Sequence, residues 1–122
     1  MLAVFEGPDS PSHACRAARD IVQWARHFEG ISFWNPPPIG IGIHHGTFLR
    51  GNLGGEAQRE FAVIGGTVNI AARLCGVAKA LEVIVSDEVR RQCAADLSLG
   101  PVECVNLKGL SEEARIARLV VD

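Results

Sequence analysis

The chain has 122 residues, of which 48% are hydrophobic and 21% are charged, and its formal net charge is −2. This length and composition suit one globular domain with a hydrophobic core and exclude a disordered chain. Basic residues are scattered singly, so no nucleic-acid-binding surface is expected. No apolar stretch approaches the roughly 20 residues that cross a bilayer, and the first residues do not resemble a secretion signal. We therefore expect a cytoplasmic protein.

The first two expected elements are a short strand and a helix. Residues Met1–Phe5 are apolar and compatible with a strand that ends at the following Gly-Pro turn. Ser10 and Pro11 suit the cap and the first position of a helix. From there to Phe28, apolar residues recur at helical spacing and give the helix one apolar face. Gly30 is placed to end it.

The middle of the chain predicts a loop, three strands and a second helix. Residues 31–38 contain Asn-Pro-Pro-Pro, which excludes a helix interior or a central strand. In Ile39–Ile43, isoleucine alternates with glycine, which predicts a strand with one apolar face and one bare face suited to close packing. A second strand is expected over Phe48–Asn52. After a glycine-rich loop, residues 61–80 predict a strand, a tight turn and a helix that begins near Thr67.

The last third combines short strands with a brief helix. Val83–Val85 predicts a strand, and Ser86 can cap a helix that runs to Cys93. Residues 102–107 and 114–121 predict a hairpin. Hairpins and crossovers thus occur together, without an internal repeat or a linker. This order favours one α+β domain over residues 1–122, a mostly antiparallel sheet with helices on one face.

Cysteine and histidine give little indication of a metal site or a disulfide framework. The four cysteines, at positions 15, 75, 93 and 104, lack Cys-x-x-Cys spacing, and such scattered cysteines are most often reduced. His44 and His45 are adjacent at the end of an expected strand. Their side chains would point to opposite faces, so they cannot readily share one metal ion. A turn or core role is the better interpretation for both.

Asn69 and Arg73 carry the most specific chemistry in the chain. They lie four residues apart on the expected helix, so their side chains project side by side. An amide beside a permanent cation suits a ribose and the charge of a reacting phosphate. Both would lie at the edge of the helix's buried face. From spacing alone, a solvated arginine and a helix-start asparagine are the simpler interpretation.

Several segments closely resemble class III nucleotidyl cyclases, the adenylate and guanylate cyclase family. The most specific is Phe-Ala-Val-Ile-Gly-Gly-Thr-Val-Asn-Ile-Ala-Ala-Arg-Leu, at residues 61–74. Other similar segments follow in the family's order: Leu-Ala-Val-Phe at 2–5, Ile-Gly-Ile-His-His-Gly at 41–46, Gly-Asn-Leu-Gly at 51–54, Val-Ile-Val-Ser at 83–86 and Leu-Lys-Gly-Leu-Ser at 107–111. Several motifs in register are specific, whereas one glycine motif would be weak. The resemblance implies a ferredoxin-like sandwich.

The resemblance also implies roles for individual residues. Asn69 matches the asparagine that positions the ribose, and Arg73 matches the arginine that neutralises the phosphate as the 3′-hydroxyl attacks and pyrophosphate leaves. Lys108 resembles a lysine that reaches the phosphates, although the family's lysine can also align with Leu110. Ala62 stands where the family selects the base, and its side chain neither donates nor accepts hydrogen bonds. The choice between ATP and GTP therefore stays open.

By the same resemblance, the domain is N-terminally truncated and holds no metal alone. The family binds Mg²⁺ or Mn²⁺ with two aspartates that precede the segment matching Met1–Phe5. Asp9 and Asp20 lie on the wrong side of that segment and cannot replace them. The family's active site forms between two chains, so this chain would supply the half with Asn69 and Arg73. A complete cyclase chain could complete the site, whereas a homo-oligomer would lack the metal carboxylates.

Two alternatives to a half-site remain open. The chain could be a degenerate nucleotide-binding or dimerisation module that keeps the cyclase fold, or an unrelated α+β domain. The Met1–Phe5 strand would expose an edge and apolar surface, which predicts an oligomer or a strand exchange that covers it.

We expect the isolated chain to make no cyclic nucleotide from ATP or GTP with Mn²⁺. Two-metal catalysis needs carboxylates that hold both ions close together, and the sequence offers no such pair. A cyclic-nucleotide assay on the purified chain checks this expectation. Measurable turnover would show that the family's two aspartates are dispensable.

Overall fold

The computed structural model describes residues 1–27, 39–53, 60–64, 66–107 and 113–121, with backbone only for 49–53 and 60–64. The elements in chain order are α1 (Ser10–Arg26), β1 (Gly40–Ile43), β2 (Leu49–Leu53), β3 (Glu60–Ile64), α2 (Gly66–Val77), β4 (Glu82–Ser86), α3 (Asp87–Gln92), β5 (Glu103–Asn106) and β6 (Glu113–Arg118). None of the helices in these ranges is both long and apolar enough to span a membrane.

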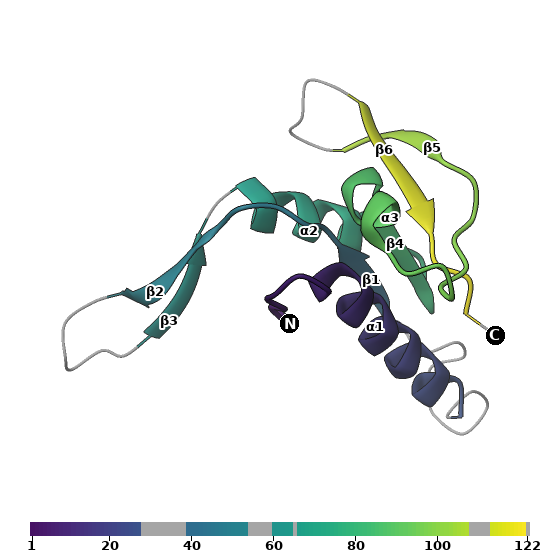
Figure 1. Ribbon diagram of the computed structural model, residues 1–122, viewed down its shortest axis with the longest axis horizontal. Coiled ribbons are helices and arrows are strands. Elements are labelled where there is room, and N and C mark those ends of the chain that lie inside the picture. The colour runs from purple at the N-terminus through teal and green to yellow at the C-terminus, as the bar shows by residue number, and fades with distance from the viewer. Residues whose placement is uncertain (28–38, 54–59, 65, 108–112, 122) are drawn as a thin grey trace.

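The strands form two separate sheets (Figure 1). The larger has the order β1-β4-β6-β5, in which β1 is parallel to β4 and the other neighbours are antiparallel. β2 and β3 form an antiparallel pair that extends away from the larger sheet, and we call this pair the arm. The expected α+β class and mostly antiparallel pairing are confirmed.

The two longer helices pack on opposite faces of the larger sheet. On one face, Cys15, Ala18 and Val22 of α1 join a buried cluster with Val83 and Val85 of β4. On the other face, Leu74 of α2 packs in a second cluster with residues 84, 107 and 116. The expectation that helices cover one face is therefore wrong. Its physical reason lies in β4, whose consecutive apolar residues are buried on both sides.

Gly42 allows α2 to lie directly against β1. A Cβ atom at this position would be 2.3 Å from the backbone nitrogen of Cys75 and 2.7 Å from the carbonyl oxygen of Ala71. The isoleucines of the same strand, Ile41 and Ile43, pack instead in the α1 cluster. The strand with one apolar and one bare face, expected from the sequence, is confirmed.

Residues 1–6 contain no regular secondary structure, which corrects the expected strand over Met1–Phe5. Leu2 and Phe5 are 54% and 39% exposed. A strand needs a neighbour for its backbone hydrogen bonds, and none of the described strands pairs with this segment. In the larger sheet, β1 and β5 are the two outer strands.

Helix boundaries differ from expectation by one to three residues. α1 begins at Ser10, and Asp9 occupies the cap position without a side-chain hydrogen bond. Ser10 is therefore inside the first turn rather than the cap. The expected ends at Phe28 and Gly30 lie outside the described residues, and α2 ends at Val77 rather than near residue 80.

The Gly42→Ala substitution is expected to destabilise the fold by roughly 1–3 kcal/mol or more, because the new methyl group meets backbone atoms that cannot rotate away. Chemical denaturation monitored by circular dichroism measures the change. Gly76→Ala in α2 is the matched control, since no atom lies within 4 Å of the added Cβ. It should raise stability by about 0.5–1 kcal/mol. Equal effects of the two substitutions would contradict this account of Gly42.

Candidate functional site

Asn69 and Arg73 lie one turn apart on α2, as the sequence predicts. Asn69 is exposed, and Arg73 is half-buried. The buried side of the helix is marked by Leu74, which is 1% exposed. The pair therefore flanks the packed face of α2 and remains accessible at least through Asn69.

The Nε atom of Arg73 is buried and has no hydrogen-bond partner within the described part of the chain. Buried polar groups are nearly always paired, and an unpaired donor costs roughly 1–3 kcal/mol. The arginine therefore keeps an unused donor next to an exposed amide. An acceptor oxygen brought to this position would satisfy it.

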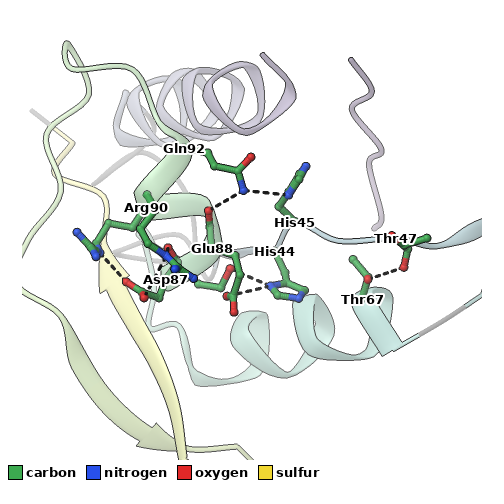
Figure 2. Close-up of polar contacts among 10 residues, drawn as sticks. His44, His45, Thr47, Thr67, Asp87, Glu88, Arg90 and Gln92 are labelled. Atoms are coloured by element: carbon green, nitrogen blue, oxygen red, sulfur yellow. Dashed lines mark hydrogen bonds and ion pairs between the residues drawn. The ribbon is translucent and has the colours of Figure 1, made fainter. Parts of the chain in front are cut away.

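The first turn of α2 is tied to the segment between β1 and the arm. Thr67 Oγ1 donates a hydrogen bond to the carbonyl oxygen of Thr47 at 2.7 Å (Figure 2). A Cβ atom at Gly46 would lie 2.6 Å from the same Oγ1 atom, so a larger residue there would displace the Thr67 side chain. Residues 44–48, which we call the arm root, thus help to set where α2 begins.

A cleft of about 330 Å³ lies beside α2. Ile70 and Leu74 form its α2 wall, and the remaining lining comes from His44, the β4–α3 junction and β6. Neither Asn69 nor Arg73 lines it. The cleft and the predicted nucleotide-binding residues are therefore separate features of the same helix.

His44 is one of the residues that line this cleft. Its Nδ1 atom is 2.8 Å from Ser86 Oγ and 3.9 Å from Glu88 Oε2. Burial lowers the pKa of His44, while the carboxylate of Glu88 opposes that effect and His45 adds to it. The imidazole is therefore held mainly in its neutral form at neutral pH.

The carboxylate of Asp87 is engaged by two arginines. Arg90 Nε donates to Oδ1 at 2.7 Å, and Arg91 Nε is 3.4 Å from Oδ2. The hydrogen bond from Arg90 and the nearby positive charges lower the pKa of Asp87 against the opposing effect of desolvation. Within the described ranges, no three His, Cys, Asp or Glu side chains are grouped so that they could hold a metal ion.

The structure gives less information about the other two predicted site residues. Ala62 lies in β3 opposite Gly51 in the backbone register, so it belongs to the arm that leads into α2. Lys108 lies outside the described residues. Sequence reasoning missed the contact of His44 with Ser86, and treated Ser86 only as a helix cap. The contact follows from the parallel pairing of Ile43 with Val85, which brings the next residues of both strands together, and residue spacing does not indicate that pairing.

The sequence matches the model of the adenylate and guanylate cyclase catalytic domain over residues 7–117. An adenylate cyclase of Rhizobium meliloti is 30% identical over 113 residues, which cover 88% of this chain and 17% of that protein. An uncharacterised protein of Mycobacterium tuberculosis is 36% identical over 125 residues, covering 95% of this chain and 21% of that protein. The chain thus spans about a fifth of the length of these relatives.

Solved structures share the fold at lower identity. A guanylyl cyclase matches with a TM-score of 0.83 and 20% identity, covering 99% of this chain and 63% of that one. The guanylate cyclase domain from Catenaria anguillulae, solved in complex with GTP, gives 0.81 and 23%, with 94% and 62% covered. A dimeric guanylyl cyclase domain from Blastocladiella emersonii gives 0.77 and 21%, with 94% and 61% covered.

We expect His44 to make the folded state less stable as the pH falls below about 6.5. The unfolded chain takes up a proton near that ordinary pKa, whereas the buried imidazole resists it until its lowered pKa is reached. The contribution of His44 to the free energy of unfolding is therefore complete above about pH 6.5. It declines as the pH falls toward the lowered pKa of the folded state. His44→Asn keeps a polar atom near Nδ1 but cannot titrate, so it should flatten the decline.

Urea denaturation between about pH 7 and pH 5 measures the effect. The control is His13→Asn, at an exposed position of α1, which should keep the wild-type pH dependence. Identical pH profiles for wild type and His44→Asn would show that His44 does not carry this dependence.

Proposed function

Because the chain belongs to the adenylate and guanylate cyclase catalytic domain family, we propose that it supplies one half of a cyclase active site formed between two chains. This half binds the ribose and the reacting phosphate through Asn69 and Arg73. The completed site converts a nucleoside triphosphate to a 3′,5′-cyclic nucleotide and pyrophosphate. The isolated chain is inactive in this proposal.

The Nε atom of Arg73, which has no hydrogen-bond partner among the described residues, is the observation that carries the proposal. A buried guanidinium donor without an acceptor is unfavourable, and a phosphate oxygen supplies a charged acceptor. Asn69 lies one turn earlier on the same helix and is exposed, so its amide is available to a ribose hydroxyl. The family's asparagine and arginine have these roles, and both residue types are retained here.

In this reaction the two residues position the substrate and stabilise charge, and neither forms a covalent bond with it. The 3′-hydroxyl and the α-phosphate belong to one substrate, so catalysis depends on holding them in line. Asn69 fixes the ribose, and Arg73 stabilises the negative charge that develops at the phosphate. The packing of α2 on Gly42 gives both side chains a rigid base. We assign Lys108 to the phosphates as a third contact.

The described residues do not fit a metal site. No suitable group of three ligands occurs among them, and Asp87 is already bound by arginines. We therefore assign the metal-binding carboxylates of the family to a complete cyclase chain that pairs with this one. The projecting arm supports such pairing, because its two strands form a sheet separate from the larger one. Among the described residues, a second copy of this chain offers no such group of ligands.

The nucleotide base is selected weakly in this proposal. Ala62 takes the place of the family's base-selecting residue, and a methyl group cannot distinguish the polar edge of adenine from that of guanine. ATP and GTP are both substrates of the completed site. The alanine at position 62 does not affect the residues that bind the ribose and the phosphate.

A complementation assay tests the half-site. The partner is a complete cyclase chain of the same family that keeps its aspartates but has its own asparagine and arginine replaced. Mixing it with this chain should restore cyclic-nucleotide formation, and Arg73→Ala should lower that activity by about 10²–10³-fold. Asn69→Ala should also lower it. Native mass spectrometry first establishes that the two chains pair.

Lys79→Ala is the control, because Lys79 is exposed and lies just beyond the end of α2. It should leave the restored activity unchanged. A paired but inactive complex would contradict the catalytic half-site. If that complex still bound nucleotide through Arg73, the degenerate binding module would be the correct function.

A further inference from the structure

Two cysteines that are distant in sequence lie in contact where α1 meets the end of α3. The Sγ atoms of Cys15 and Cys93 are 3.4 Å apart, although 78 residues separate them. Cys15 is completely buried in α1, and Cys93 follows α3 and is half-buried. Both are free thiols.

Contacts on both sides of the thiols hold them together. The backbone N–H of Ala94 donates to Ser12 Oγ at 2.9 Å. Arg16 forms an ion pair with Asp96 at 3.0 Å. These links join one turn of α1 to residues 93–96. They keep the segments that carry the two thiols close together.

We propose that Cys15 and Cys93 form an oxidisable dithiol site that peroxide converts to a disulfide between α1 and the end of α3. A disulfide needs an S–S distance of about 2.05 Å, so the sulfur atoms must approach by about 1.4 Å. Rotation about the side-chain bonds supplies a movement of this size. The helices can therefore keep their relative positions.

The partial exposure of Cys93 makes it the thiol that peroxide reaches first. Its sulfur takes one oxygen from hydrogen peroxide, which gives a sulfenic acid and releases one water. The sulfur of Cys15 then attacks Cys93, forms the S–S bond and displaces the hydroxyl group as a second water. The two thiols lose two electrons and two protons in total, and peroxide is reduced to two waters.

Because Cys15 is buried, we assign it to the second step, the attack on the oxidised Cys93. Desolvation and the neighbouring Cys93 thiol raise the pKa of Cys15 well above its ordinary range. The buried Cys15 thiol is out of reach of dissolved oxidant but lies 3.4 Å from Cys93, and its proton leaves with the displaced hydroxyl group as water. Cys75 and Cys104 are exposed. They provide internal controls for nonspecific oxidation.

Peptide mapping of the whole chain tests the proposal. The purified protein is treated with a small excess of hydrogen peroxide, its free thiols are alkylated after unfolding, and its peptides are identified by mass spectrometry. We expect a linked Cys15–Cys93 peptide and a loss of about 2 Da, both reversed by dithiothreitol. Cys93→Ser should abolish the link, whereas the Cys75→Ser, Cys104→Ser double variant should retain it.

The proposal is overturned if wild-type Cys93 is oxidised to a sulfinic acid while Cys15 stays fully alkylatable. It is also overturned if the links formed involve Cys75 or Cys104 instead. Both results come from the wild-type protein, so they do not depend on the folding of a variant. The test needs neither nucleotide nor partner and stands apart from the proposed cyclase function.

Discussion

The close packing of α2 against β1 at Gly42 is the constraint on which the candidate site depends. Backbone atoms of α2, rather than side-chain tips, occupy the space that a Cβ atom at this position would need. The helix cannot approach β1 in this way over any larger residue. Because Asn69 and Arg73 project from that helix, their positions are fixed by the strand beneath it. β1 is in turn held by its parallel pairing with β4.

Several polar contacts lie near the carboxyl ends of β1 and β4, close to the packing of α2 on β1. His44 follows β1 and meets Ser86, the last residue of β4. The next residue, His45, lies 3.2 Å from Gln92 Nε2 on α3 (Figure 2). Thr67 ties the start of α2 to the same arm root. One junction therefore connects the arm, the site helix and α3, and a shift in any of them alters the contacts of the others.

Local sequence patterns predicted much of the fold. They failed where contacts with a distant segment of the chain determine the structure. Alternating glycine and isoleucine predicted both faces of β1, and the spacing of Asn69 and Arg73 predicted their common helix face. The apolar run in β4 did not show that helices lie on both sides of the sheet. The strand expected at Met1–Phe5 failed because apolar composition cannot supply a hydrogen-bonding neighbour. The contact of Cys15 with Cys93 and that of His44 with Ser86 depend on chain crossings that spacing does not encode.

The parallel pairing of β1 with β4 also affects the order in which the molecule folds. His44 and Ser86, which meet at the end of this pairing, are 42 residues apart. The arm and α2 lie within that interval, so the chain must close a long loop before β1 joins the sheet. The hairpin of β5 and β6 needs only local contacts and can form earlier. The surface on which α2 rests is therefore assembled late, and the residues proposed to bind nucleotide come into place among the last.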